Sequence, residues 1–257
     1  MPYFTHQGLR IHYETFGDVT AGTPVLLLHG FASSARINWV SPSWTEALTA
    51  AGFAVIAPDH RGHGQSDKPH DPAAYSLDIM AADALALMDR LNVPAAHVMG
   101  YSMGARVATV MALEWPDRVQ RLILSGMAGS LLTGVGKSEE IAAALEADDP
   151  SAISGARGLS FRQFAEKAGN DLKALAAVMR AERRAIAPEE LRRLAMPVLV
   201  TVGDDDPIAG PLEPLAQAIP HAETFVIEGR NHMNAVGDAR HKRVVVEFLR
   251  SQPDDGQ

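Results

Sequence analysis

A serine flanked by glycines, in the string Gly100-Tyr101-Ser102-Met103-Gly104, is the part of this sequence that most directly predicts chemistry. The G-x-S-x-G pattern is typical of a sharp turn between a strand and a helix, where the serine side chain stands clear of the backbone. Ser102 is therefore a candidate nucleophile. Because a serine hydroxyl reacts poorly at neutral pH, this hypothesis also requires a base, an acid that orients the base, and donors for an oxyanion.

The segments around Ser102 alternate between two kinds of pattern. Short apolar runs predict buried strands at 24–28, 54–57, 96–99, 122–124, 197–203 and 224–227. Helical spacing of apolar residues predicts helices over 76–91, 103–114 and 241–250. Two further strand-like runs between residues 3 and 16, separated by Gln7-Gly8, predict a hairpin. The alternation implies an α/β fold with a mostly parallel sheet and helices on both of its faces.

Local signals predict where several helices begin. Ser43 with Glu46 and Ser160 with Gln163 have the spacing of capping boxes, and Pro188 suits a first helical turn. The stretch 32–41 is expected to be a polar loop.

The alternation stops between Gly129 and Ala195, where only helical patterns are evident. We interpret residues 130–195 as a helical cap inserted over the carboxyl edge of the sheet, with residues 1–129 and 196–257 forming the core. The apolar residues of the insertion either hold its helices together or line a pocket, and the sequence leaves that choice open. They are Leu131, Leu132, Ile141, Leu145, Leu159, Phe161, Phe164, Leu175 and Met179.

Residues with reactive or unusual side chains follow four of the predicted strands. They are His29-Gly30-Phe31, Ser102, Asp204-Asp205-Asp206 and Gly229-Arg230-Asn231-His232. Ligands of open α/β sheets bind outside the carboxyl ends of the strands, so these residues are expected to meet there. With this order of nucleophile, acid and histidine, the chain resembles the α/β-hydrolase superfamily over nearly its whole length. The resemblance implies an eight-stranded, mostly parallel sheet with a small helical cap, and no cofactor or metal.

The same resemblance implies roles for five residues. Ser102 is the nucleophile and His232, after the last strand, is the general base. The spacing Gly-x-x-Asp after the strand that ends at Gly203 favours Asp206 over Asp205 as the acid. The N–H groups of Phe31 and Met103 are the expected oxyanion hole.

The other histidines have contexts that fit a general base less well than that of His232. Five are predicted to lie in polar or surface-like contexts, namely His6, His12, His70, His221 and His241. His97 is expected to pack beside a strand, and His29 to brace its loop. The stretch Asp59-x-Arg61-Gly62-x-Gly64-x-Ser66 is similar to a structural turn of the superfamily, in which Asp59 and Arg61 tie neighbouring loops. A metal site of Asp59, His60 and His63 is the less favoured alternative.

Composition narrows the class of protein. The chain has 257 residues, of which 47% are hydrophobic and 21% are charged, and its net charge of -8 comes without a basic cluster, so nucleic acid is not an expected partner. The absence of cysteine excludes disulfides and a thiolate nucleophile. No apolar run is long enough for a membrane span, so a cytoplasmic protein is expected, of undetermined oligomeric state.

The expected reaction is hydrolysis of a small to medium apolar carboxylic ester through an acyl-enzyme on Ser102. Two alternatives stay open: a carbon–carbon bond hydrolase of ring-cleavage products, and a small-molecule receptor built on a hydrolase scaffold. Peracid formation of the perhydrolase kind is a conceivable side activity. Arg36 is a candidate partner for a substrate carboxylate, although a solvated arginine is the preferred interpretation.

Overall fold

The computed structural model describes residues 2–133, 138–182 and 185–251 of the protein. One eight-stranded sheet runs through it, with the strand order β1-β2-β4-β3-β5-β6-β7-β8. Its strands are β1 (Tyr3–His6), β2 (Leu9–Phe16), β3 (Val25–Leu28), β4 (Val55–Pro58), β5 (Ala96–Tyr101), β6 (Val119–Ser125), β7 (Val198–Gly203) and β8 (Glu223–Ile227). From β4 to β8 all neighbouring strands are parallel, whereas β1 and β2 are antiparallel to their neighbours. The predicted mostly parallel sheet is confirmed.

The antiparallel edge of the sheet is the predicted hairpin. Gln7 and Gly8 both have positive φ angles, 49° and 78°, as a tight turn between right-twisted strands requires. β2 then pairs with β4, so that the hairpin extends the sheet on its β4 side.

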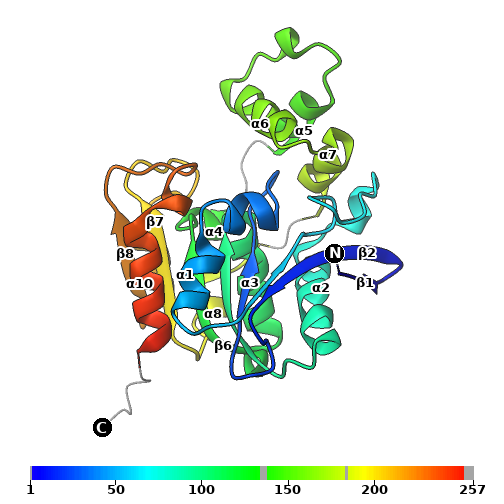
Figure 1. Ribbon diagram of the computed structural model, residues 1–257. Helices are drawn as coiled ribbons and strands as arrows, with labels where there is room; N and C mark the ends of the chain where they lie inside the picture. The colour runs from blue at the N-terminus through cyan, green and yellow to red at the C-terminus, as the bar shows by residue number, and fades with distance from the viewer. Residues whose placement is uncertain (1, 134–137, 183–184, 252–257) are drawn as a thin grey trace.

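Helices cover both faces of the sheet, and the period of two along each strand divides the core between them. Leu26 and Leu28 of β3 belong to the cluster that contains α2 (Leu77–Arg90) and α3 (Met103–Glu114). Val25 and Leu27 point the other way, into the cluster with α1 (Trp44–Ala50) and α10 (Ala239–Arg250). Figure 1 shows α1 and α10 on one side of the strands and α3 on the other.

Three local predictions were wrong. Ser43 precedes α1 in a left-handed conformation (φ 62°) in place of the extended one typical of an N-cap, and its side chain caps nothing; Glu46 accepts a hydrogen bond from Thr45. Ser160 lies inside α6 (Ala156–Lys167), which begins after Gly155, so it caps no helix either. The expected loop 32–41 contains a π-helical turn, η1 (Arg36–Val40).

No strand is found between residues 130 and 195 in the described part of that segment. Its helices are α4 (Ser130–Thr133), α5 (Ser138–Glu146), α6, α7 (Leu172–Arg180) and α8 (Pro188–Leu191), with Pro188 in a first turn as predicted. Residues 134–137 and 183–184 of the expected cap lie outside the described residues. In Figure 1, α5, α6 and α7 form a group of their own above the end of the sheet. After β7, a short helix that the sequence did not indicate, α9 (Glu213–Ala218), leads to β8.

Two hydrogen bonds between described residues tie this helical group to the body. The side-chain amide of Asn170, between α6 and α7, donates to the carbonyl of Ala32 at 2.8 Å. Asp171, which also caps α7, lies 2.9 Å from Nε2 of His70. The first of these contacts reaches the loop that carries Phe31.

Candidate active site

Ser102 occupies a strained turn between β5 and α3. Its backbone has φ 55° and ψ −113°, a combination that a side-chain-bearing residue adopts only where the surroundings impose it. The flanking glycines explain how the turn closes. A Cβ atom on Gly100 would lie 2.2 Å from the carbonyl oxygen of Gly104, and one on Gly104 would lie 2.0 Å from that of Leu28. Neither position admits a side chain, which explains why glycine stands on both sides of the turn.

His232 and Asp206 lie beside this serine. The Ser102 hydroxyl is 2.9 Å from Nε2 of His232, and Nδ1 of the same ring is 2.7 Å from Oδ2 of Asp206. His232 and Asp206 are both buried. Asp204 and Asp205 are exposed, and Asp204 accepts a hydrogen bond from the N–H of Arg230. Of the three consecutive aspartates, the fold therefore brings only Asp206 to the histidine.

The imidazole and the carboxylate are both held by further contacts. Oδ1 of Asp206 accepts hydrogen bonds from the N–H groups of Ile208 and Ala209, each at 2.9 Å. The Tyr101 hydroxyl donates to the carbonyl of His232 at 2.6 Å, which fixes the loop after β8 against the turn that carries Ser102. Burial of Tyr101 and the nearby charge of Asp206 raise the pKa of its phenol, so this donor keeps its proton.

The Phe31 and Met103 N–H groups belong to the two segments next to Ser102. Both residues border the same cavity as Ser102, and no acceptor for either N–H is found in the described part of the chain. The loop before Phe31 is fixed by Asn38, whose Oδ1 accepts the Gly30 N–H at 3.1 Å. Two donors without protein acceptors beside a serine can bind an oxygen that carries negative charge.

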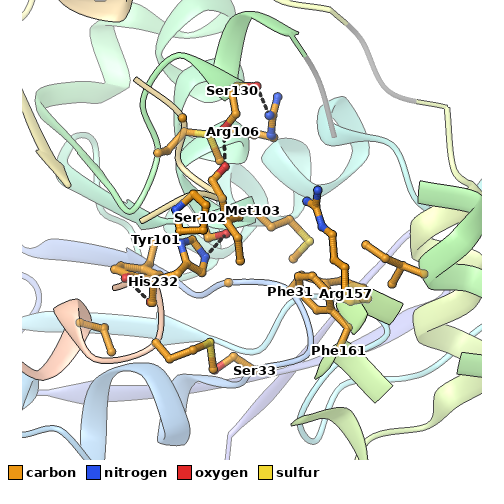
Figure 2. A pocket seen from close by; sticks show the side chains of 18 of the residues that line it. Phe31, Ser33, Tyr101, Ser102, Met103, Arg106, Ser130, Arg157, Phe161 and His232 are labelled. Atoms are coloured by element: carbon orange, nitrogen blue, oxygen red, sulfur yellow. Dashed lines mark hydrogen bonds between the residues drawn. The ribbon is translucent and has the colours of Figure 1, made fainter. Parts of the chain in front are cut away.

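A cavity of about 590 Å³ opens over Ser102 and His232. Five of the nine apolar residues proposed for the insertion line it: Leu132, Ile141, Phe161, Phe164 and Met179. The other four, Leu131, Leu145, Leu159 and Leu175, do not, so both interpretations of the insertion apply to part of it. Figure 2 shows Ser102 and Met103 between His232 on one side and Phe31, Phe161 and Arg157 on the other.

Comparison with known proteins identifies the family to which this fold belongs. The family model for the alpha/beta hydrolase fold matches residues 23–151, just over half of the chain. The chain belongs to the alpha/beta hydrolase fold family. A thermophilic esterase from Thermogutta terrifontis, solved with malate bound, is 28% identical with a TM-score of 0.71 over 96% of each chain.

Curated relatives of this alpha/beta hydrolase include enzymes whose names indicate different substrates. A 3-oxoadipate enol-lactonase of Acinetobacter baylyi is 28% identical over 90% of this chain and 89% of its own. A 2-hydroxymuconate semialdehyde hydrolase of a Pseudomonas species is 36% identical over 48% of this chain and 41% of its own. The matched part of the chain spans about two fifths of the length of several such relatives.

A second buried cluster in this alpha/beta hydrolase also joins a serine to a histidine. Nε2 of His241 lies 3.1 Å from the Ser125 hydroxyl and 2.9 Å from that of Thr201, and all three side chains are fully buried. None of them borders the cavity. The cluster therefore joins β6, β7 and α10 and is closed to substrate. His241 and His12 were both expected in polar or surface-like contexts, and that prediction was wrong: apolar periodicity does not reveal a histidine satisfied inside the core.

His29 braces the loop that carries Phe31, as expected. Its Nδ1 donates to the Gly30 carbonyl at 2.8 Å, while Nε2 accepts the N–H of His60 at 3.0 Å. Burial lowers the pKa of His29, in agreement with a neutral ring that donates at one nitrogen and accepts at the other.

Asp59 and Arg61 tie neighbouring loops, which confirms the structural interpretation of that stretch. The Asp59 carboxylate accepts the N–H groups of Ala35 and Gln65 and faces Nδ1 of His12 at 2.9 Å. Arg61 makes two hydrogen bonds to Asp83 and one to the carbonyl of Ala74. Within residues 2–133, 138–182 and 185–251, no three His, Asp or Glu side chains are placed to share a metal ion.

The sequence did not single out two arginines of the cavity, Arg106 and Arg157. Arg157 precedes Phe161 and Phe164 by four and seven residues on α6, a spacing that places all three on one helix face. This spacing could have indicated that Arg157 lies on the same side as the two phenylalanines. Arg36, the candidate considered from sequence, is exposed and does not border the cavity.

Of the helices that the structure describes, none combines the length and the apolar character needed to cross a membrane.

Proposed function

We propose that the protein is a serine hydrolase that cleaves small to medium carboxylic esters through an acyl-enzyme on Ser102. The hydrogen-bonded series from Ser102 to His232 to Asp206, at 2.9 and 2.7 Å beside a 590 Å³ cavity, is the observation that carries this proposal. Apolar side chains from Phe31, Phe161 and Phe164 favour an apolar part of the substrate next to the scissile bond.

In this mechanism Ser102 attacks the ester carbonyl while Nε2 of His232 accepts its proton. Asp206 stabilises the imidazolium that forms, and the N–H groups of Phe31 and Met103 donate to the oxyanion. The imidazolium then protonates the leaving alkoxide oxygen, and the acyl group stays on Ser102. Water attacks the acyl-enzyme with His232 again as base, which releases the acid and restores the serine.

The division into a core of residues 1–129 and 196–257 and a cap of residues 130–195 is part of the proposal. It is supported by the lining of the cavity, to which Phe161, Phe164 and Met179 contribute from the segment and Phe31 from the body. The cap thus encloses a small-molecule substrate over Ser102 and limits its size.

A second candidate is carbon–carbon bond hydrolysis, which the similarity to a 2-hydroxymuconate semialdehyde hydrolase favours. The enol-lactonase relative instead favours carbon–oxygen cleavage, because a lactone is a cyclic ester. We therefore keep the ester as the first candidate.

Two measurements test the proposal. A fluorophosphonate probe should label the folded protein at Ser102 and leave Ser102→Ala unlabelled, and a failure to label would favour a receptor over a catalyst. A series of p-nitrophenyl esters of increasing chain length, run beside a vinylogous 1,5-diketone, separates the two reactions. Turnover of the diketone alone would replace the esterase proposal with the carbon–carbon one.

A further inference from the structure

The cavity over Ser102 has an electrostatic character opposite to that of the whole chain. The chain carries a net charge of -8, yet the described residues around the cavity include two arginines and neither aspartate nor glutamate. A cavity wall of largely apolar side chains strengthens the attraction between such cations and an anion inside it, because water screens the charges less.

The Nε groups of both arginines are buried without a hydrogen-bond acceptor among the described residues, so the two side chains differ only at their terminal nitrogens. Arg106 is buried and donates to the backbone carbonyls of Ser130 and Leu131. Arg157 has a buried Nε, and the described residues offer that N–H no acceptor. A buried donor without a partner destabilises the protein. A ligand that supplies the acceptor removes this cost, and the recovered free energy strengthens its binding.

The position of Arg157 near the start of its helix is unfavourable for a positive charge, so helix stability does not explain why an arginine occurs there. It lies in the first turn of α6, where the helix dipole disfavours a cation and favours an anion. With Ser160, Phe161 and Phe164 it forms the i, i+3, i+4, i+7 stripe of α6, and all four residues border the cavity. The arginine is thus directed to the cavity by the same helix face that places the two phenylalanines there.

The catalytic geometry proposed above indicates which part of a substrate reaches Arg157. The leaving oxygen must face Nε2 of His232 to receive its proton, so the acyl part extends away from His232. Figure 2 places Arg157, with Phe31 and Phe161, on that opposite side of Ser102. The Phe31 and Phe161 rings contact each other edge to face, with their centroids 5.8 Å apart, and both border the cavity between the serine and Arg157.

We propose that Arg157 binds a carboxylate on the acyl part of the substrate, so that the preferred esters are monoesters of dicarboxylic acids. This inference rests on the serine hydrolase function proposed above. The alcohol leaves with a proton from His232, the acyl-enzyme retains its remote carboxylate at Arg157, and water releases the free dicarboxylate. No other reactant is needed.

The test compares substrates that differ only at the far end of the acyl chain. Mono-4-nitrophenyl adipate and 4-nitrophenyl hexanoate have the same chain length, with a carboxylate replacing a methyl group. The glutarate and pimelate monoesters change the distance between the ester carbonyl and the carboxylate. The measured quantity is the ratio of kcat/KM for the monoester to that for the neutral ester. We expect a ratio above one in the wild type for at least one length, and Arg157→Met to lower it by about ten- to a hundredfold, mainly through KM.

Two further variants separate a specific contact from a general effect. Arg157→Lys keeps the positive charge but loses the planar guanidinium that can donate two parallel hydrogen bonds to a carboxylate. Its kcat/KM ratio should therefore lie between those of Arg157→Met and the wild type. Arg36→Met removes a cation that is exposed and outside the cavity wall, so the ratio should not change. An unchanged ratio in Arg157→Met, or a loss of equal size in Arg36→Met, would overturn the inference while leaving ester hydrolysis intact.

A binding measurement keeps the inference testable if neither ester is hydrolysed. Adipate binding to Ser102→Ala by calorimetry should weaken at least tenfold when Arg157→Met is added. Adipate that binds equally well to both proteins would contradict the role of Arg157. Binding that depends on Arg157 in a protein that hydrolyses no ester would contradict the esterase proposal only.

Discussion

Nδ1 of His232 lies 2.7 Å from one oxygen of Asp206, whose other oxygen accepts the N–H groups of Ile208 and Ala209. The carboxylate is thereby held in place by its own loop, independently of its contact with the imidazole. A carboxylate held in this way can select the tautomer of His232 that presents an unprotonated Nε2 to Ser102. Asp205, its neighbour in the chain, points to solvent.

Replacing Asp206 by Asn should lower kcat for ester hydrolysis by roughly 10³- to 10⁴-fold, because the amide favours the wrong tautomer of His232 and does not stabilise its charged form. Asp205→Asn is the matched control and should stay within about twofold of the wild type, since surface substitutions away from a site have small effects. Steady-state kinetics on one p-nitrophenyl ester measures both. Equal losses in the two variants would contradict the assignment.

Ser102→Ala should lower kcat by roughly 10⁶-fold, because the remaining groups of the site act only through the nucleophile. The free energy of unfolding should change little, because alanine keeps the Cβ atom and with it the strained backbone at φ 55°. Kinetics and chemical denaturation of the same preparation test both statements. Residual activity above about 1% would indicate another nucleophile.

Gly104→Ala should destabilise the protein by about 3 kcal/mol or more, since its Cβ would lie 2.0 Å from the backbone oxygen of Leu28. Gly237→Ala provides the comparison, because the nearest atom to its Cβ would be a Pro42 carbon at an ordinary 3.7 Å. Urea denaturation should show a large loss of stability for the first variant and less than about 1 kcal/mol for the second. The steric account of the turn fails if the two variants are equally stable.

Stability should fall as the pH decreases from about 6.5 to about 4. Burial lowers the pKa of His241 from 6.5 to about 4, so the unfolded chain takes up a proton in this window while the folded protein does not. Above pH 6.5 the ring is neutral in both states and the full stability is present; for His241 alone the loss by pH 4 is roughly 3 kcal/mol.

The His241→Gln variant isolates this contribution. At pH 8 its difference from the wild type measures the lost packing and hydrogen bonds alone. Towards pH 4 that difference should shrink, because the variant has one fewer buried base to protonate. Urea denaturation across this range measures it, and parallel stability curves at all pH values would show that His241 does not contribute to the acid sensitivity.

The sequence by itself determined the parts that depend on local spacing and chain order. The two glycines around Ser102 leave room for a turn, and the period of apolar residues predicts strands and helices wherever one side of an element is buried. The order of Ser102, Asp206 and His232 followed the carboxyl ends of successive strands. Parallel strands bring such ends to one edge, so local pattern was sufficient to predict that these residues meet.

Only the tertiary structure decided what depends on contacts between distant segments. His241 and His12 are fully buried because Ser125, Thr201 and Asp59 satisfy them, and no local pattern records such partners. Arg157 and Arg36 are both arginines near apolar residues in sequence, yet one borders the cavity and the other faces solvent. The difference arises because packing, and not residue type, determines which face of a helix lies over Ser102.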